Sequence, residues 1–385
     1  MPADLLLPTY DGSSLRAVMP AVLESLGHST RSAQRDSAED LATLGLPTAR
    51  RACVVMLDGV GAHLLRERGG HCPFLRRELA DSLTLRTGYP STTAASLTLL
   101  GTGESPGTTG MLGYTVRHPA SGELMNLISW LDAPAAPEEW QRVPTLVEQV
   151  GQVRERVVSI GLPRFADSGL TRAALRGPRF IGATELGHRV DAAVAELRGR
   201  SADLVYLYWG DVDTTGHHFG WKSAEWGEAM ELVDAELSRL ARELPRDTLL
   251  VVTADHGMID LEADSRIDVA HEPALSADVE LVAGEPRAVH VHTATDRAAQ
   301  VQARWTEFLG DSAWVLSREE AIAAGLFGEV TDAHREVIGD IVVATRGTRA
   351  VMDSRTQTAA SLRLIGVHGS LTPAELEVPL IRLAT

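Results

Sequence analysis

The chain has 385 residues, of which 44% are hydrophobic and 23% charged, enough to bury a large core. Its 36 basic and 52 acidic residues give a formal net charge of −16, which argues against a nucleic-acid duplex or an anionic membrane as the main partner. Two cysteines, Cys53 and Cys72, do not make a disulfide framework. The N-terminus is too short and acidic for a signal peptide, and no apolar run approaches the ~20 residues of a membrane helix, so we expect a cytoplasmic protein.

Three regions follow from the pattern of apolar residues. Residues 1–48 are predicted to be an N-terminal appendage, with a helix around 13–26 and a polar linker over 28–40. Residues 49–263 and 351–385 alternate strands and helices, which predicts an α/β domain with a mostly parallel central sheet and helices on both faces. Residues 264–350 are predicted to be a smaller, cap-like α+β insertion, with strands at 288–292 and 313–316 and a helix over 296–309.

The first chemically informative site follows the strand over 54–57. That strand delivers Asp58 to the edge of the predicted sheet, and Gly59 and Gly61 allow a tight turn into a helix. A single Asp at such a position is often only a helix cap. A functional role for Asp58 becomes the better interpretation only if similar sites follow in the sequence.

A cluster of hydroxyl groups comes next, at the start of a predicted helix over 94–100. Thr92 and Thr93 precede this helix, where free N–H groups and the positive end of the helix dipole favour a phosphate group. Helix capping alone is the alternative interpretation. Next to a metal ion, however, one of these hydroxyl groups could lose its proton and act as a nucleophile.

The strand over 204–209 is followed by Asp211, Asp213 and His217. Asp213 and His217 are four residues apart, so one helical turn would place both side chains on one face, where they could bind the same ion. Asp211 is the competing carboxylate, but it lacks this spacing to His217.

Two further strand ends complete the pattern. The apolar run 249–252 leads to Asp255 and His256, and a late strand over 362–367 is expected to end at His368. His271 is a weaker candidate. In open α/β sheets, ligands bind at the edge where the parallel strands end. Three Asp and three His residues without cysteine suit zinc or manganese in a catalytic site with open coordination positions.

These motifs, in this order, resemble the alkaline phosphatase superfamily, and within it the nucleotide pyrophosphatase/phosphodiesterase branch. The resemblance extends over roughly residues 50–380. It implies two divalent metal ions, zinc or, as the alternative, manganese. The resemblance also implies their ligands: one ion is held by Asp213, His217 and His368, and the other by Asp58, Asp255 and His256.

The resemblance also points to the nucleophile. Counting back from the Thr102-Gly103 pair places it at Thr93, with Thr92 as the alternative. The family usually carries an Asn three residues after the nucleophile, where its amide holds a phosphate oxygen. Ser96 stands there in this chain and is expected to bind substrate in its place.

The resulting hypothesis is a hydrolase that cleaves phosphodiester or pyrophosphate bonds through a phosphothreonine intermediate. Its partner would be a small phosphorylated substrate, with a nucleotide as one candidate, and the oligomeric state stays open. The alternatives within the superfamily are a phosphomonoesterase, a phosphonate hydrolase or a phosphomutase. A non-catalytic metal-binding protein is a further alternative, which the complete ligand set disfavours.

Overall fold

A seven-stranded sheet forms the centre of the molecule. The computed structural model describes residues 2–33 and 35–384. The strand order is β2–β17–β8–β1–β7–β5–β6. The bounds of these strands are Arg51–Leu57 (β1), Leu83–Arg86 (β2), Val157–Gly161 (β5), Arg179–Gly182 (β6), Leu204–Trp209 (β7), Thr248–Thr253 (β8) and Glu377–Ala384 (β17).

The pairing of these strands confirms the predicted mostly parallel sheet. Strands β8, β1, β7, β5 and β6 pair in parallel with their neighbours, whereas β17 runs antiparallel between β2 and β8. The parallel strands are nearly continuous apolar runs; all six residues of β8, for example, are buried. Such runs require helices on both faces of the sheet.

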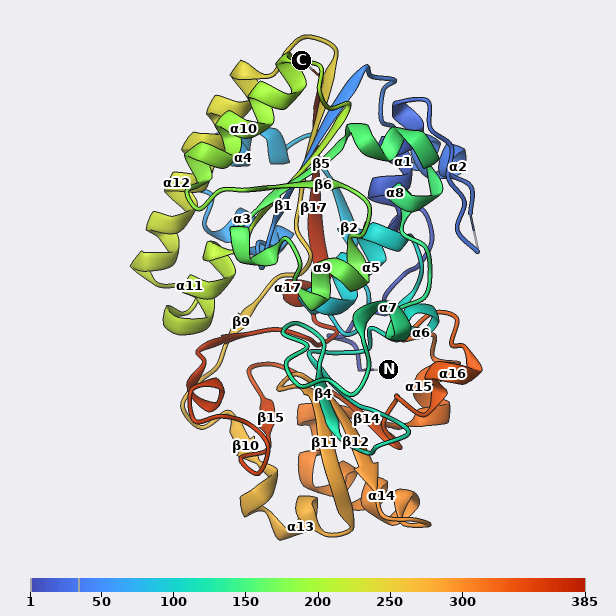
Figure 1. Ribbon diagram of the computed structural model, residues 1–385. Coiled ribbons are helices and arrows are strands. Elements are labelled where there is room, and N and C mark those ends of the chain that lie inside the picture. The colour runs from blue at the N-terminus through green and yellow to red at the C-terminus, as the bar shows by residue number, and fades with distance from the viewer. Residues whose placement is uncertain (1, 34, 385) are drawn as a thin grey trace.

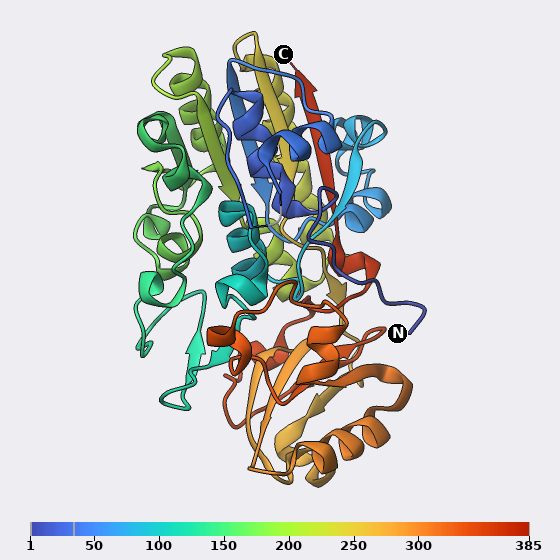
Figure 2. The ribbon, with the colours of Figure 1, turned by 90° about the vertical axis from the view of Figure 1, so that its right-hand side faces the viewer.

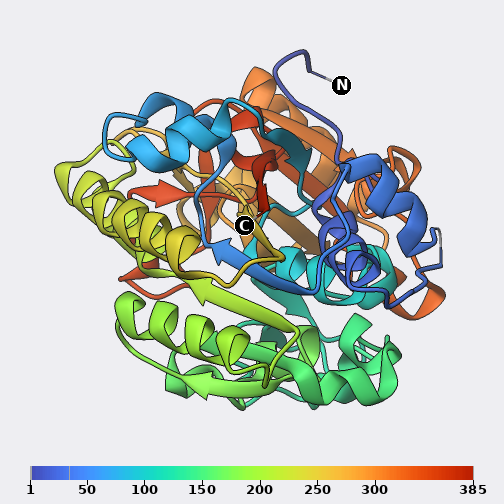
Figure 3. The ribbon, with the colours of Figure 1, turned by 90° about the horizontal axis from the view of Figure 1, so that it is seen from above.

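Helices cover both faces of this sheet (Figures 1 and 3). On one side lie α3 (Ala62–Glu67), α4 (Pro73–Leu79), α10 (Leu186–Arg198) and α12 (Ala224–Glu243). On the other lie α1 (Val18–Ser25), α5 (Thr93–Thr102) and α9 (Gly169–Ala174). The buried residues of α12 follow helical spacing: Trp226, Met230, Val233, Leu237 and Leu240. This apolar stripe docks α12 on the sheet.

The predicted appendage shares the main core. Leu15 and Val18 join the same buried cluster as the central strands, and Arg16 forms a buried ion pair with Asp40. Helix α2 (Ser37–Leu44) begins inside the stretch that was expected to be a linker. The described part of this region, residues 2–33 and 35–48, therefore packs as part of the main domain.

One predicted strand is wrong. The chain was expected to return to the central sheet before His368, but residues Ser361–Arg363 form a 3-10 turn and only Gly366–Val367 (β16) are extended. Strand β16 pairs with β9 (Ile259–Asp260) in a separate two-stranded sheet. Leu362 and Leu364 pack in a small cluster with Met352. These side chains are apolar because they fill that cluster, and they are not part of the central core.

The insertion folds around a four-stranded antiparallel sheet with its own core (Figure 2). The strand order is β11 (Val279–Glu285), β12 (Ala288–Thr293), β14 (Ile341–Thr345) and β13 (Ala313–Ser317), and α14 (Ala298–Leu309) covers it. The predicted strands at 288–292 and 313–316 and the helix over 296–309 are thereby confirmed. We call residues 264–350 the subdomain.

Shorter elements complete the chain. They are α6 (Pro106–Thr109), β3 (Thr115–Arg117), β4 (Leu124–Asn126), α7 (Pro137–Trp140), α8 (Leu146–Gln149), α11 (Asp211–Phe219), β10 (Arg266–Asp268), α13 (Pro273–Ser276), α15 (Arg318–Ala323), α16 (Asp332–Arg335), β15 (Ala350–Met352) and α17 (Pro373–Leu376). Within residues 2–33 and 35–384, no helix has the length and apolar character needed to cross a membrane.

A fully buried ion pair fastens the subdomain to the main domain. Arg287, in the turn between β11 and β12, donates from Nε and Nη2 to the Glu375 carboxylate at 3.0 and 2.7 Å. Glu375 also accepts from the Ser370 N–H at 2.9 Å, and its backbone carbonyl accepts from the Gly257 N–H at 2.8 Å. Both side chains are 0% exposed, so neither charge can be solvated if its partner is lost.

We expect Arg287→Met to lower the free energy of unfolding by about 3–5 kcal/mol, because it leaves the Glu375 carboxylate buried without a cation. Urea titration followed by circular dichroism measures the change. Adding Glu375→Gln removes the stranded charge and should recover most of the loss. A double variant as unstable as Arg287→Met alone would show that the charge is not the cause.

Candidate active site

The predicted metal ligands converge at one edge of the central sheet. Asp58 follows β1, Asp255 and His256 follow β8, and Asp213 and His217 lie on α11 after β7. His368 follows β16 and reaches the same place from the C-terminal part of the chain. Two sets of these residues bring their ligand atoms within 4.8 Å of one another: Asp58, Asp255 and His256, and Asp213, His256 and His368.

The contacts within this cluster are close. His256 Nε2 lies 3.4 Å from Asp58 Oδ1 and 3.5 Å from Asp255 Oδ2. His217 Nε2 lies 3.1 Å from Asp213 Oδ2, as the four-residue spacing predicts for a helix. The rings of His256 and His368 stack with centroids 3.7 Å apart. His256 therefore stands at the centre of the cluster.

All three histidines are oriented in the same way. Their Nδ1 atoms lie within hydrogen-bond distance of backbone carbonyl oxygens: 2.7 Å for His217 and Gly366, 3.0 Å for His256 and Gly257, and 2.9 Å for His368 and Ser91. Such a bond fixes Nδ1 as the donor and leaves Nε2 as the free ligand atom. This is the arrangement found for histidines that bind metal ions.

Three carboxylate oxygens in the cluster are buried without a hydrogen-bond partner among the described residues. They are Asp58 Oδ1, Asp213 Oδ1 and Asp255 Oδ2. Buried polar atoms are rarely left unpaired, because each loses its hydration without compensation. Divalent cations, one beside Asp58 and Asp255 and one beside Asp213, would satisfy these oxygens, so the residues present fit a metal site.

The pKa values reflect the crowding of negative charge. Burial, together with the carboxylates of Asp255 and Asp213, raises the pKa of Asp58 well above its usual value, although the Tyr208 hydroxyl donates a hydrogen bond to it. Burial also raises the pKa of Asp255. For Asp213, burial is outweighed by His217, which holds the pKa below its usual value. A cluster of this kind is stabilised by added positive charge.

The geometry leaves one ligand assignment open. Asp58, Asp255 and His256 group together, as the resemblance implied. Asp213 groups with His368 and His256, whereas His217 touches Asp213 from the neighbouring turn of α11. The division of the six residues into two three-ligand sets stays a prediction.

Of the two candidate threonines, Thr93 is the one whose hydroxyl group contacts this cluster. It is the first residue of α5, and its Oγ1 lies 3.2 Å from His256 Nε2. Thr92 precedes it in extended conformation, and its side chain makes no capping bond to the helix. The hydroxyl of Thr93 is thus placed among the candidate ligands, at the end of a helix that favours anions.

The structure does not bring Ser96 to the cluster. Its side chain is fully buried, its Oγ pairs with Thr87 Oγ1 at 2.8 Å, and it lines neither cavity beside the site. It lies one turn inside α5, where the helix packs on the protein. Phosphate binding by Ser96 stays a prediction that no contact in the structure supports.

Two cavities open beside Thr92, and the first of them also reaches Thr93. The first, which we call the inner cavity, has a volume of about 290 Å³ and apolar walls that include Leu162, Phe165, Leu170, Leu175 and Phe180. The second, the interdomain cavity, has about 490 Å³ and lies between the main domain and the subdomain. Both are lined by Thr92, Tyr114, His217 and His368. A substrate whose phosphorus sits at Thr93 can thus extend in two directions.

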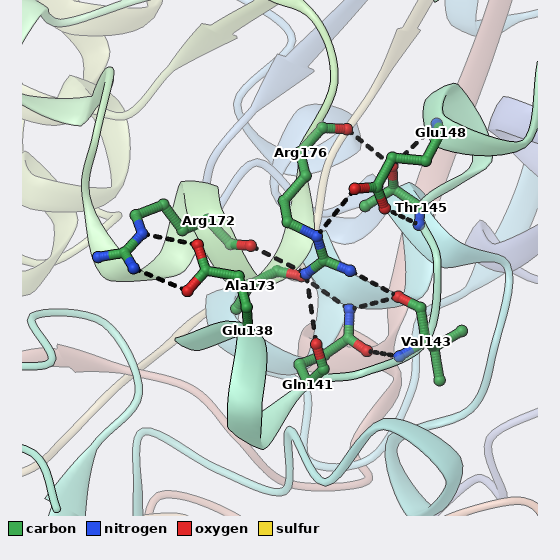
Figure 4. A network of polar contacts seen from close by, with 8 residues as sticks. All are labelled: Glu138, Gln141, Val143, Thr145, Glu148, Arg172, Ala173 and Arg176. Carbon is green, nitrogen blue, oxygen red and sulfur yellow. Dashed lines mark hydrogen bonds and ion pairs between the residues drawn. The ribbon is translucent and has the colours of Figure 1, made fainter. Parts of the chain in front are cut away.

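Helix α9, which supplies a wall of the inner cavity, is held by a polar network (Figure 4). Arg176 donates to the carbonyl oxygens of Val143, Ala173 and Gln141 at 2.8, 2.9 and 3.3 Å. Arg172 forms an ion pair with Glu138 at 2.7 Å. These bonds tie α9 to α7 and α8, so this wall is built as a fixed surface.

Sequence reasoning missed two residues of the site. Tyr208 donates to Asp58, and Glu285 reaches the interdomain cavity from β11. Tyr208 could have been found from the sequence, because it lies two residues after Tyr206 on the same strand and therefore on the same face of the sheet. Both tyrosines line the inner cavity. Glu285 carries no such signal, since it is 192 positions away from Thr93 (285 minus 93).

The sheet, its edge and the cluster at that edge define a molecule of the alkaline phosphatase superfamily. A family model described as Type I phosphodiesterase / nucleotide pyrophosphatase matches residues 52–371. The chain belongs to this family.

Solved structures with the same fold include murine ectonucleotide pyrophosphatase / phosphodiesterase 5, with a TM-score of 0.69, 16% identity and coverage of 87% of this chain and 88% of that one. Phosphonoacetate hydrolase from Sinorhizobium meliloti 1021 has a TM-score of 0.70, 22% identity and coverage of 92% of both chains. Human ectonucleotide pyrophosphatase/phosphodiesterase family member 7 is 34% identical over 84 residues, which are 20% of this chain and 18% of that protein. The chain thus matches less than a fifth of that relative's length.

Proposed function

We propose that the chain is a metal-dependent hydrolase that cleaves phosphodiester or pyrophosphate bonds, with Thr93 as its nucleophile. The observation that carries this proposal is the position of the Thr93 hydroxyl, 3.2 Å from His256 inside a cluster with three unpaired carboxylate oxygens. Family membership supports the hydrolase class. A solved inactive form of murine ectonucleotide pyrophosphatase / phosphodiesterase 5 carries a threonine-to-alanine substitution and is in complex with AMP, which agrees with a threonine nucleophile.

The reaction would run in two in-line displacements. The Thr93 oxygen forms a bond to phosphorus while the bond to the leaving oxygen breaks, which gives a phosphothreonine diester and an alcohol. A water molecule then attacks the same phosphorus, the bond to Thr93 breaks, and the hydroxyl recovers its proton. The net change is one diester and one water converted to a monoester and an alcohol, with no oxidation or reduction.

The proposed metal ions, zinc or manganese, would be held by Asp58, Asp255 and His256 and by Asp213, His217 and His368. When bound, two divalent ions supply the positive charge that favours deprotonation of the nucleophile and stabilises the leaving oxygen. The protein's own contribution is to hold these groups in place. The N–H groups at the start of α5 can hold a phosphoryl oxygen, and the buried histidines keep their Nε2 atoms directed into the cluster.

The two cavities support a diester as the substrate. A diester has a substituent on each side of phosphorus, and the inner and interdomain cavities meet at Thr92, Tyr114 and His368. A phosphomonoester would leave one of them empty. The apolar walls and aromatic residues of the inner cavity suit an uncharged, ring-bearing substituent, which includes a nucleoside.

We expect a diester preference of at least tenfold in kcat/KM, or ~1.4 kcal/mol in transition-state binding. A monoester adds a negative charge, and among the residues that the structure describes Arg164 is the one Arg or Lys that lines either cavity. Arg164 is exposed, and its guanidinium lies over the Phe165 ring. Comparing kcat/KM for bis- and mono-(p-nitrophenyl) phosphate on metal-loaded protein measures the preference. A tenfold preference for the monoester would refute the diesterase assignment and leave the family unchanged.

A screen of wider scope tests the substrate class. Zinc-loaded and manganese-loaded protein would be assayed on dinucleotides, nucleotide sugars, phosphomonoesters and phosphonoacetate. Release of a nucleoside monophosphate from dinucleotides or nucleotide sugars supports the proposal. Turnover confined to phosphonoacetate would replace it with a phosphonate hydrolase.

A further inference from the structure

Each buried carboxylate of the cluster has one oxygen that is free and one that is held. The free oxygens are Asp58 Oδ1, Asp213 Oδ1 and Asp255 Oδ2, which have no hydrogen-bond partner among the described residues. Asp255 Oδ1 accepts from two backbone N–H groups, at 3.0 and 3.1 Å, and Asp213 Oδ2 lies 3.1 Å from His217 Nε2. For Asp58, the second oxygen accepts a hydrogen bond from the Tyr208 hydroxyl. Of these partners, Tyr208 is the one side chain that is not itself a candidate ligand.

The pairing of β1 with β7 brings Tyr208 to Asp58. The two strands run parallel with Met56 opposite Tyr208, and the Asp58 N–H continues the ladder by donating to the Trp209 carbonyl at 2.9 Å. Neighbouring strands lie about 5 Å apart, a distance that a tyrosine side chain can span. The phenol group therefore reaches from one strand to the carboxylate at the end of the next.

Packing fixes the direction of the Tyr208 side chain. Arg189, which is buried, donates from Nη1 to the Tyr208 carbonyl at 2.6 Å, and the Phe165 ring meets the Tyr208 ring edge-on with centroids 5.9 Å apart. A Cβ atom on Gly210 would lie 2.8 Å from the Tyr208 hydroxyl oxygen, closer than real Cβ contacts. The φ of Gly210 is −116°, which any residue can adopt, so this glycine serves to leave space for the hydroxyl group. The local packing thus supports the bond from Tyr208 to Asp58.

One free oxygen per carboxylate limits which ion the site suits. Asp58, Asp255 and His256 then offer three ligand atoms, two oxygens and one nitrogen. Zinc binds four ligands in a tetrahedron, and three protein ligands leave it one open position. Manganese prefers six ligands that are mostly oxygen atoms, so it gains from a second oxygen of the same carboxylate. A hydrogen bond that occupies Asp58 Oδ2 therefore favours zinc over manganese.

We propose that Tyr208 is a positioning residue, which holds Asp58 to a single ligand oxygen and so sets the preference of the site for zinc over manganese. Tyr208 also lines the inner cavity, but this role concerns the metal site and not the substrate. The inference rests on the proposed function, because it assumes that a divalent ion binds beside Asp58. It concerns a residue that is neither a metal ligand nor the nucleophile.

The test is the affinity of Tyr208→Phe for zinc and for manganese, measured by titrating each ion into metal-free protein in a calorimeter with a competing chelator. Phe keeps the ring and removes the hydroxyl group, so Asp58 is free to turn and to bind with both oxygens. We expect the Kd of one zinc ion to rise about tenfold, as is usual when a hydrogen-bond partner of a metal ligand is lost. The Kd of the corresponding manganese ion should stay within about twofold, because the second oxygen offsets the loss.

Tyr206→Phe is the matched control. Tyr206 lies two residues before Tyr208 on the same face of β7 and also lines the inner cavity. Its buried hydroxyl group has no hydrogen-bond partner in the part of the chain that the structure describes. Removing this group should leave the Kd values of both ions unchanged, whereas a general disturbance of β7 would weaken metal binding in both variants.

The inference is overturned if Tyr208→Phe binds zinc as tightly as the unaltered protein, or if it weakens the binding of zinc and manganese by the same factor. It is also overturned if Tyr206→Phe changes the ratio of the two Kd values as much as Tyr208→Phe does. If Tyr208→Phe fails to fold, Tyr208→Met, which adapts to the same space without a donor, replaces it in the same titrations.

Metal binding needs no turnover, so the two proposals can fail separately. A protein that shows this dependence on Tyr208 and cleaves no diester would refute the proposed function and leave the inference standing. An active diesterase whose metal affinities do not change in Tyr208→Phe would refute the inference alone.

Discussion

Thr93→Ala is expected to lower kcat for a phosphodiester by at least about a thousandfold, because it removes the atom that forms the bond to phosphorus. The fold should be nearly unchanged. Thr93 is the first residue of α5 and provides no helix cap. Among the described residues, its hydroxyl has one hydrogen-bond partner, His256. Steady-state kinetics on bis-(p-nitrophenyl) phosphate measures the loss, with circular dichroism and metal content as checks on integrity.

Thr92→Ala is the matched control for this substitution. The two residues are adjacent and both line the inner cavity, but of the two only Thr93 has its hydroxyl within hydrogen-bond distance of His256. We therefore expect Thr92→Ala to be much milder. If the two effects were reversed, Thr92 would be the nucleophile and the count back from Thr102-Gly103 would be wrong by one residue.

Removal of metal is the second change expected to abolish activity. We expect about two zinc or manganese ions per chain and a loss of at least about a thousandfold in kcat after chelation, restored by adding the metal back. The physical reason is the cluster itself. Without cations, three buried carboxylate oxygens have no hydrogen-bond partner among the described residues, and the pKa of Asp58 is raised by burial and by its acidic neighbours. Elemental analysis of purified protein, before and after chelation, gives the stoichiometry.

Asp255→Asn sharpens this prediction. Asp255 is fully buried, and its Oδ1 accepts the Gly59 N–H at 3.1 Å, a bond that an amide oxygen can keep. The substitution preserves shape and removes charge, so the protein should fold but lose one of its two ions together with its activity. Purified protein that holds no metal and keeps full activity after chelation would refute the metal-dependent scheme.

Much of this site could be predicted from sequence because its parts are local. Asp58, Asp255 and His256 each come directly after an apolar run, and the ends of parallel strands necessarily meet at one edge. The proximity of Asp213 and His217 could be predicted from the periodicity of a helix alone, and both residues do lie on α11. The central sheet and the elements of the subdomain could be predicted from apolar runs of the same kind.

The remaining features depend on contacts between distant segments. Ser96 was predicted from its distance along the chain to Thr93, but its direction is decided by Thr87, which accepts or donates a bond inside the core. The apolar residues before His368 resembled a central strand, although they fill a small cluster beside β9 and β15. Glu285 lines the same cavity as Thr92 only because the subdomain packs against the sheet edge, and no spacing in the sequence predicts that packing.

The position of β17 has a consequence for how the molecule is made. This strand, Glu377–Ala384, lies between β2 and β8, so β2 joins the sheet only through the last strand of the described chain. His368 belongs to the same late stretch. During synthesis from the N-terminus, the ribosome must therefore release residues 366–384 before either the sheet or the cluster is complete. A nascent chain stalled before that point exposes the open edge of β8, and this interval is when a chaperone would be most useful to it.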